Sequence, residues 1–266
     1  MSKQNEVVFA EVRKQEIIDI VNKMSKVTVS YLCDHFSVSP ATIRNDLQEL
    51  EDAGALKRTH GGAISSRRIS YELNSSQKEI ENVAQKRAIA EYAASYIKPG
   101  DAIALDTGTT TFELAKHLAG IPDLIVVTND LQIAAYLEQN ANVTIILAGG
   151  MVRRHFHCTV GKAAADSIQG LHVDKLFAAA NGVHATKGVT THNMDMADIK
   201  RHFINAADEV YLLADSSKLR KSAFITFAPM SNIDVLVTDK KADDAFAEEM
   251  EQLGVEVHRV QFDNKQ

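Results

Sequence analysis

Three stretches within the first fifty residues place apolar side chains at the spacing of an α-helix. Within each stretch these residues recur at intervals of three and four, so they share one face of the helix. They are Ile17, Ile20, Val21 and Met24 in the first stretch, Val29, Leu32, Cys33 and Phe36 in the second, and Ile43, Leu47 and Leu50 in the third. Short helices are not stable alone, so the pattern predicts three helices around a shared core.

The residues around these stretches indicate where the helices begin and end. Thr28 and Ser39 can cap the second and third helices. Pro40 suits the first position of the third helix, where an N–H would have no helical partner anyway. Gly54 predicts the end of that helix.

A β-hairpin is predicted directly after the third helix. Leu56–His60 alternates like a strand, Gly61-Gly62 forms a turn, and Ala63-Ile64 returns. Three helices followed by a hairpin predict a winged helix-turn-helix.

The polar face of the third helix carries side chains suited to contact with DNA. The residues on this face and its N-terminal flank are Ala41, Thr42, Arg44, Asn45 and Gln48. They are small, cationic or amide-bearing, and such side chains fit a major groove and pair with base edges or phosphates. The hairpin turn is flanked by Lys57, Arg58 and His60, which suit backbone or minor-groove contacts. The alternative is a three-helix interaction module with a solvated polar face.

Charge is unevenly distributed along the chain, whose formal net charge is −6. Residues 1–70 hold ten Lys and Arg against nine Asp and Glu, and the rest of the chain holds 19 against 26. Because the distribution of charge matters more than the total, an acidic body does not argue against a DNA-binding head.

The expected location is the cytoplasm. Residues 1–10 lack the pattern of a signal peptide, and no apolar run approaches the roughly 18 residues that cross a bilayer. Cys33 and Cys158 stand far apart without metal or redox spacing, which suits a reducing compartment. We predict no membrane partner.

The remainder of the chain alternates short apolar runs with amphipathic helical stretches. A helical pattern from Gln77 to Ile97 comes first. The candidate strands that follow are Ala102–Leu105, Leu124–Val127, Val143–Leu147, Lys175–Ala179, Val210–Ala214, Val235–Val237 and Val255–Val260. This alternation predicts an α/β domain with a mostly parallel sheet covered on both faces.

Polar loops follow several of these strands, at the edge where parallel sheets bind ligands. Hydroxyls and free N–H groups after the first strand can hold an anion, and an arginine and a lysine after later strands favour a phosphate with sugar hydroxyls. The predicted effector-binding residues are Asp106, Thr107, Gly108, Thr109, Thr110, Thr111, Thr128, Asn129, Gly149, Gly150, Arg153 and Lys218. The alternative for the first loop is an ordinary strand-to-helix turn.

The sequence gives less support for metal binding and for catalysis. His155, His157 and Cys158 form part of a zinc-like cluster, but no second cluster supplies the remaining ligands, so we predict no metal and no cofactor. An enzyme is the alternative function, with Asp106, Asp215 and Lys218 as acid and base. The DNA-reading head favours a regulator, because an enzyme has no need of one.

Motifs along nearly the whole chain share the pattern of one known family. They are Ser-Pro-Ala-Thr-Ile-Arg-Asn-Asp-Leu at 39–47, Arg-Thr-His-Gly-Gly-Ala at 58–63, Asp-Thr-Gly-Thr-Thr at 106–110, Thr-Asn at 128–129, Gly-Gly at 149–150, Gly-Val-Thr-Thr-His-Asn at 188–193, Lys-Arg at 200–201 and Ala-Asp-Ser-Ser-Lys at 214–218. With these motifs the sequence resembles the DeoR family of bacterial sugar-responsive transcription regulators.

The resemblance carries expectations for both parts of the chain. It implies operator contacts for Ser39, Thr42, Arg44 and Asn45, although family members commonly carry a second arginine at the position of Asn45. It implies a sensor domain similar in fold to ribose-5-phosphate isomerase that binds phosphorylated sugars or related metabolites. It also adds Asn193 to the predicted effector-binding residues.

The predicted organisation has three parts. Residues 1–64 form the winged helix-turn-helix, residues 65–76 a linker, and residues 77–266 the effector-sensing α/β domain. One winged helix makes few DNA contacts, so we expect a homodimer or homotetramer on repeated half-sites of double-stranded operator DNA. The helix at 77–97 and the sensor surface are candidates for the contact between copies. The expected function is a repressor of a carbohydrate-catabolism operon, controlled by a phosphorylated sugar.

Overall fold

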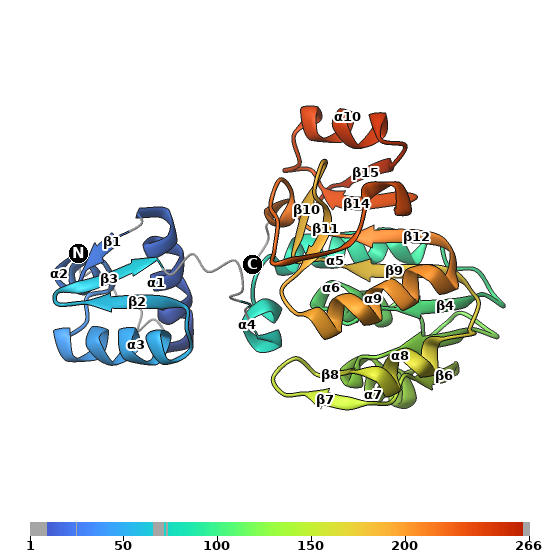
Figure 1. The fold of residues 1–266 in the computed structure, drawn as a ribbon, viewed down its shortest axis with the longest axis horizontal. Coiled ribbons are helices and arrows are strands. Elements are labelled where there is room, and N and C mark those ends of the chain that lie inside the picture. The colour runs from blue at the N-terminus through green and yellow to red at the C-terminus, as the bar shows by residue number, and fades with distance from the viewer. Residues whose placement is uncertain (1–9, 25, 66–71, 73, 263–266) are drawn as a thin grey trace, which may run out of the picture. The chain divides into compact units, whose positions relative to one another are not determined.

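The computed structural model describes residues 10–24, 26–65, 72 and 74–262. Contacts between residues divide the chain into two compact units, Met1–Tyr71 and Glu72–Gln266 (Figure 1). None of the helices in the described ranges is long and apolar enough to span a bilayer.

The first unit is a winged helix-turn-helix, as the sequence predicts. Its elements are α1 (Ala10–Met24), β1 (Lys26–Thr28), α2 (Val29–Phe36), α3 (Pro40–Asp52), β2 (Leu56–Thr59) and β3 (Gly62–Ser65). The strands form an antiparallel sheet in the order β1-β3-β2. Strand β1 is the one element that the sequence did not indicate here, because three residues are too few to show a period of two.

The predicted caps set the ends of α2 and α3. The Thr28 hydroxyl accepts a hydrogen bond from the backbone N–H of Tyr31 at 3.2 Å, and that of Ser39 accepts one from Thr42 at 3.1 Å. Between the two helices Ser37 adopts a left-handed conformation with φ 54°. The caps satisfy N–H groups that have no partner inside a helix, and this fixes the tight turn between α2 and α3.

The core of the first unit follows the predicted stripes with one correction. Leu32, Ile43 and Leu47 are fully buried as expected. Met24, expected in the core, is 49% exposed, and Ile18 is buried instead. The apolar face of α1 is therefore rotated toward Ile18, so that Met24 at the end of the helix points to solvent.

A buried ion pair ties α1 to α3. The Arg13 Nε donates to Asp46 Oδ2 at 2.7 Å, and both residues are less than a tenth exposed. The hydrogen bond that Arg13 donates to Asp46 raises the pKa of Arg13. Asp46 lies on the otherwise apolar side of α3, where its charge can be buried only because Arg13 pairs with it.

The second unit is an α/β domain. Its helices are α4 (Ser75–Glu79), α5 (Val83–Ala94), α6 (Thr109–Ala115), α7 (Leu131–Asn140), α8 (Lys162–Ile168), α9 (Met194–Ala206) and α10 (Asp244–Gln252), with short 3-10 turns at Ser216–Lys218 and Met230–Asn232. The main-sheet strands are β4 (Ala102–Leu105), β5 (Ile125–Thr128), β6 (Thr144–Leu147), β9 (Val173–Ala179), β12 (Ala207–Leu213), β14 (Val235–Asp239) and β15 (Glu256–Val260). All seven predicted strands are confirmed, with ends shifted by at most three residues.

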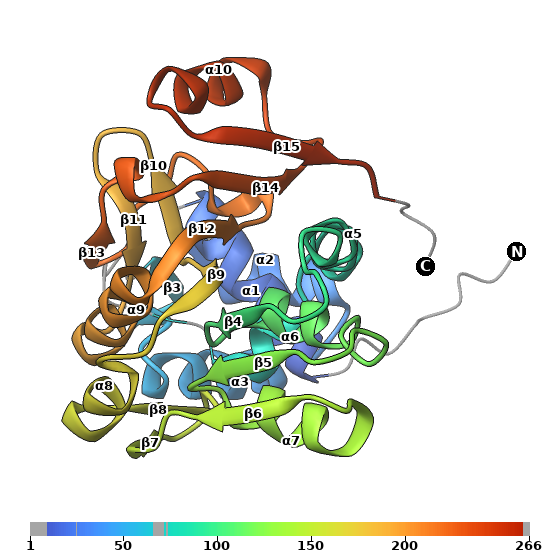
Figure 2. The ribbon, with the colours of Figure 1, turned by 90° about the vertical axis from the view of Figure 1, so that its right-hand side faces the viewer.

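These seven strands form one sheet in which every described pairing is parallel. Their order is β15-β14-β12-β9-β4-β5-β6 (Figure 2). Ile103 and Leu105 of β4 pack with α5, α6 and α7 on one face, while Ala104 belongs to the core with α8, α9 and α10 on the other. Helices on both faces explain why the strands read as nearly continuous apolar runs.

The chain reverses its direction of travel across the sheet between β4 and β9. From β4 it proceeds outward to β5 and β6, and then returns to place β9 on the other side of β4. At such a reversal the connections leave neighbouring strands toward opposite faces, which opens a crevice beyond the strand ends.

The prediction of a single helix over 77–97 is wrong. The segment forms two helices, α4 and α5, separated at Asn82, which has a φ of 50°. Asn82 donates from its side chain to Asp215 Oδ1 at 3.2 Å and to Ser217 Oγ at 3.3 Å. Contacts with a loop more than 130 residues away thus hold the break, and a local period cannot reveal them.

Smaller strands were also missed. They are the hairpin of β7 (Met151–Arg153) and β8 (Cys158–Val160), and the antiparallel sheet of β10 (Gly182–His184), β11 (Gly188–Thr191) and β13 (Ile225–Ala228). They are three or four residues long and are stabilised by pairing with distant segments, so their sequences carry little periodic signal.

Replacing Asp46 by asparagine should destabilise the first unit. The substitution removes the charge of Asp46 that pairs with Arg13, and breaking a buried pair typically costs about 3–5 kcal/mol. Calorimetric unfolding of the full chain should show a transition at lower temperature in the Asp46→Asn variant. Asp34→Asn, at an exposed position of α2, is the matched control, and equal melting of the two variants would contradict this role of the pair.

Candidate functional site

The third helix presents the predicted polar face to solvent. Ala41, Arg44, Asn45 and Gln48 are exposed, and Thr42 is half-buried beside the cap Ser39. Arg44 also lines a hollow bounded by α2, α3 and the hairpin turn, whose wall includes His60 and Gly61. The face is thus free for an external partner.

The hairpin of β2 and β3 is the wing of this unit. Two side chains that were predicted to contact DNA also bind the wing to α3. Arg58 donates to Gln48 through its guanidinium and to Glu51 Oε1 through its backbone N–H at 2.8 Å. Lys57 and His60 remain exposed. Arg58 and Gln48 therefore hold the wing against the helix, in addition to any contact with DNA.

Of the two glycines in the hairpin turn, Gly62 is the one that the packing requires. A Cβ at Gly62 would lie 1.8 Å from the Val27 carbonyl oxygen, whereas one at Gly61 would meet no atom within 4 Å. The wing approaches β1 at Gly62 too closely for any side chain.

The second unit holds a pocket at the crevice between the ends of β4 and β9. Six of the predicted effector-binding residues line it: Thr107, Gly108, Thr109, Thr110, Arg153 and Lys218. The walls also include Asn181 after β9, Lys78 on α4, Lys86 on α5 and Lys200 on α9. Residues from segments far apart in the sequence therefore meet at the switch point of the sheet.

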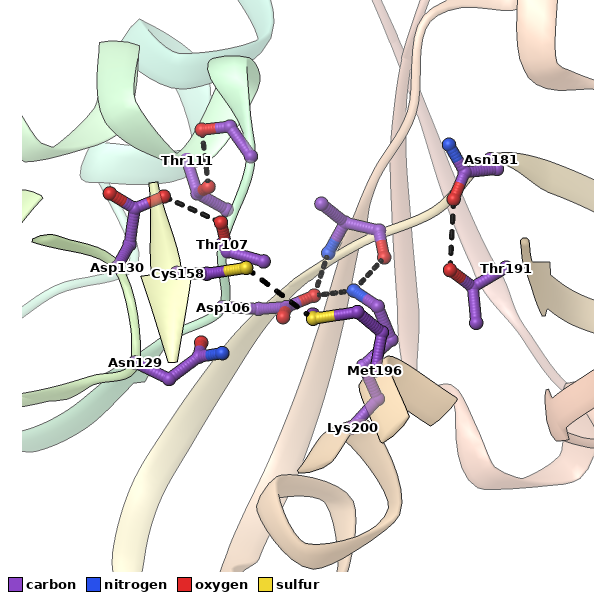
Figure 3. A network of polar contacts seen from close by, with 12 residues as sticks. Asp106, Thr107, Thr111, Asn129, Asp130, Cys158, Asn181, Thr191, Met196 and Lys200 are labelled. Carbon is purple, nitrogen blue, oxygen red and sulfur yellow. Dashed lines mark hydrogen bonds and ion pairs between the residues drawn. The ribbon is translucent and has the colours of Figure 1, made fainter. Parts of the chain in front are cut away.

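A buried ion pair forms the floor of this pocket. Lys200 donates to Asp106 Oδ2 and, at 2.9 Å, to the Ala179 carbonyl oxygen (Figure 3). The same Asp106 oxygen accepts the Ala179 N–H at 2.9 Å. Asp106 is 1% exposed and does not line the cavity. Its effect is to place the Lys200 ammonium between β4 and β9.

The loop after β4 is shaped by close packing and by one further carboxylate. A Cβ at Gly108 would lie 2.9 Å from the Ala179 Cβ, while its backbone is extended with φ 164°. Glycine is therefore needed here for the close approach of β9, and not for a left-handed backbone conformation. The Thr107 hydroxyl donates to Asp130 Oδ2 at 2.6 Å, and burial raises the pKa of Asp130.

Cationic side chains outnumber carboxylates in the lining of the pocket, with five lysines and arginines against Glu72, Glu81 and Asp215. Burial lowers the pKa of Lys86 to about 8, and its ammonium donates to the Lys78 carbonyl. Burial also lowers the pKa of Lys78. The ion pair with Glu72 opposes this effect, and the positive charges of Lys218 and Lys200 add to it. No described residue bonds to the Lys218 ammonium, which faces the cavity as an unpaired cation.

Comparison with known proteins gives the chain its family. A family model described as the DeoR-like helix-turn-helix domain matches residues 13–68, and one described as the DeoR C-terminal sensor domain matches residues 81–240. The chain belongs to the DeoR family.

Curated relatives of this DeoR-family chain match over almost their whole length. It is 37% identical to the HTH-type transcriptional regulator GlpR of Haloferax volcanii over 92% of this chain and 96% of the relative. It is 32% identical to the HTH-type transcriptional repressor GlcR of Bacillus subtilis over 94% of this chain and 96% of the relative. Among solved structures, a D-ribose-5-phosphate isomerase in complex with phospho-erythronic acid aligns with a TM-score of 0.38 at 18% identity, over 50% of this chain and 52% of that one. The relatives and both family models make the chain a DNA-binding transcriptional regulator, and the enzyme alternative is not favoured.

Several predicted effector-binding residues of this DeoR-family regulator lie outside the pocket. Thr128 donates to the Leu105 carbonyl at 2.7 Å, and Asn129 donates to the Thr159 carbonyl at 3.0 Å. Asn193 caps α9 by accepting from Met196 N–H at 2.9 Å. Their polar groups serve the strand ends and helix caps. Thr111, Gly149 and Gly150 likewise do not line the cavity.

The most informative residues of the pocket were not predicted. Lys86 shares the buried face of α5 with Ala90 and Ala93, so a lysine on an apolar helical stripe was the available signal. Lys200 was noted only within a family motif. Asp215, considered as an acid or base, is 2% exposed and caps the turn at Ser217, whose N–H it accepts at 2.9 Å.

The histidine and cysteine cluster has a structural explanation. His155 and His157 lie in the turn between β7 and β8 with φ of 69° and 55°. Their carbonyl oxygens accept from Ser75 at 3.0 Å and from Leu131 at 2.7 Å. Cys158 is buried, which raises the pKa of its thiol to about 11. Over the described ranges, no three His, Cys, Asp or Glu side chains come together as metal ligands.

Proposed function

We propose that this regulator binds operator DNA as a homo-oligomer in the cytoplasm and that a phosphorylated sugar in the pocket changes its affinity for DNA. The observation that carries this proposal is the gathering of cations around a hydroxyl-rich loop. The cations are Lys78, Lys86, Arg153, Lys200 and Lys218. Such a set is suited to a ligand with a concentrated negative charge.

The pocket also offers groups for the neutral part of a sugar phosphate. Thr109 and Thr110 supply hydroxyls, and Asn181 supplies an amide whose oxygen already accepts from Thr191 at 2.9 Å. Amides and hydroxyls both donate and accept, as sugar hydroxyls require. A sugar phosphate can therefore place its phosphate against the cations and its sugar against these hydroxyls and this amide.

In this proposal each predicted segment of the chain has its own role. Residues 1–64 contact DNA through Ser39, Ala41, Thr42, Arg44, Asn45 and Gln48 and through Lys57, Arg58 and His60 of the wing. Residues 77–266 bind the effector, and residues 65–76 connect the two. Two heads on repeated half-sites provide the contacts that one winged helix lacks. We infer repression of a carbohydrate-catabolism operon, a direction supported by the relative that is named a repressor.

A first prediction concerns Arg44. Arg44→Ala should weaken operator binding by about 1–3 kcal/mol if the guanidinium pairs with a guanine edge. If it contacts a phosphate instead, affinity should fall equally on all sequences and with a shallower salt dependence. Fluorescence anisotropy with promoter and random duplexes at two salt concentrations separates these results. Arg87→Ala removes an equally exposed charge from α5, and an Arg44 variant that binds like this control would exclude contact with DNA.

A second prediction concerns the free cation of the pocket. Lys218→Ala should weaken effector binding at least about tenfold, since a hydrogen bond to a charged group is worth about 1.5–3 kcal/mol. DNA binding without effector should be unchanged. A thermal-shift panel of pentose and hexose phosphates identifies the ligand, and calorimetry then compares the variants. Lys221→Ala, at an exposed position three residues on, should behave as wild type. Equal affinities in both variants would reject this pocket.

A third prediction concerns pH. Because the pKa of Lys86 is about 8, the ammonium that attracts the effector is lost as the pH rises above that value. A phosphate monoester, with a second pKa of about 6, is fully charged over the same range. Affinity should therefore fall by up to about tenfold per pH unit above pH 8. In Lys86→Met affinity should be weaker and should fall less steeply between pH 8 and 9.5, because the pocket no longer loses the charge of Lys86. A wild-type affinity that stays constant from pH 8 to 9.5 would show that Lys86 does not act through its charge.

A further inference from the structure

The anion pocket contains a carboxylate of its own. Glu72 lines the cavity, and its side chain is 9% exposed. Its Oε1 accepts from the Lys78 ammonium at 2.7 Å, and the Arg153 Nη2 lies 2.9 Å from its Oε2. Both cations are thus occupied by an acidic side chain of the same chain.

Glu72 connects three segments. It is the first residue of the second unit and directly follows Tyr71, the last residue of the first. Lys78 belongs to α4, and Arg153 ends β7 with its guanidinium 3.6 Å from the centre of the Phe156 ring. The carboxylate therefore ties the start of the second unit to one wall of the pocket.

The electrostatics show that Glu72 is held as an anion. Burial alone would raise the pKa of Glu72, but the charges of Lys78 and Arg153 and the hydrogen bond from Lys78 together keep it below its usual value. The buried carboxylate depends on these two partners, because an ion taken out of water is stable only when paired. Any other anion that binds the same cations must compete with it.

We propose that Glu72 is an internal anion, which the negatively charged group of the effector displaces from Lys78 and Arg153. This inference rests on the proposed function and deepens it. A phosphate offers more oxygens and more charge than a carboxylate, so it can replace one on the same lysine and arginine. Displacement releases the residue that joins the second unit to the DNA-binding unit along the chain.

The displacement supplies the differential interaction that an effector needs. A ligand shifts an equilibrium only if it binds one state better than the other. Here one state has Glu72 on the two cations, and the other has the cations free for the ligand. The anion-binding affinity of the pocket therefore includes the free energy spent in removing Glu72.

The test compares the full-length wild type with Glu72→Gln, using inorganic phosphate as the probe in titration calorimetry. Glutamine keeps the shape but removes the competing charge, so Glu72→Gln should bind phosphate about fivefold tighter or more, the lower end of typical coupling between sites. Glu79→Gln removes an exposed carboxylate from α4 outside the pocket and should bind as wild type. Equal or weaker binding by Glu72→Gln would overturn the inference.

A measurement on the wild type keeps the test valid if Glu72→Gln does not fold. The Ser75 N–H donates to the His155 carbonyl at 3.0 Å, and this bond should open more often when Glu72 no longer anchors the segment. Hydrogen exchange over residues 74–79 should accelerate with saturating phosphate, while α10 stays unchanged. Unchanged or slower exchange rejects the displacement. If neither phosphate nor any sugar phosphate binds wild type or variant, the proposed function itself fails; binding without competition from Glu72 defeats only this inference.

Discussion

The pocket of the second unit depends on balancing the positive charge of partly and fully buried side chains. Five cationic side chains converge there, and like charges brought together out of water repel strongly. Carboxylates on neighbouring segments offset part of this repulsion: Asp106 pairs with Lys200 on the floor, and Glu72 pairs with Lys78 and Arg153. The pocket is therefore stable without a ligand and remains able to attract an anion.

The position of the pocket follows from the order of the strands. Because β9 lies on the other side of β4 from β5, the loops after β4 and β9 diverge, and α9 can insert Lys200 between them. The approach is close enough that Gly108 cannot be replaced by a residue with a side chain without moving β9. The sheet thus fixes the geometry of the pocket, and its charges come from the surrounding helices and from Arg153 of β7.

Both units contain buried ion pairs, but the pairs have different roles. In the first unit, the buried Arg13–Asp46 pair holds α1 against α3 and so sets the orientation of the face that carries Arg44. In the second, the buried pairs hold cations at the pocket in which we propose that the effector binds. The partner of the first pair is permanent, whereas a partner such as Glu72 can be exchanged for an external anion of greater charge.

Local patterns in the sequence determined the winged helix, its caps and all seven strands of the main sheet. A helical period, a capping hydroxyl and an apolar run each act within a few residues and can be read directly. The loop at Thr107–Thr110, with Arg153 and Lys218, was also predictable, because parallel strands end at one edge. The break at Asn82, the burial of Lys86 and the pairing of Glu72 with Arg153 were decided by tertiary structure alone. Each of these depends on partners far away in the chain, and only the completed sheet and the helices packed on it bring those partners together.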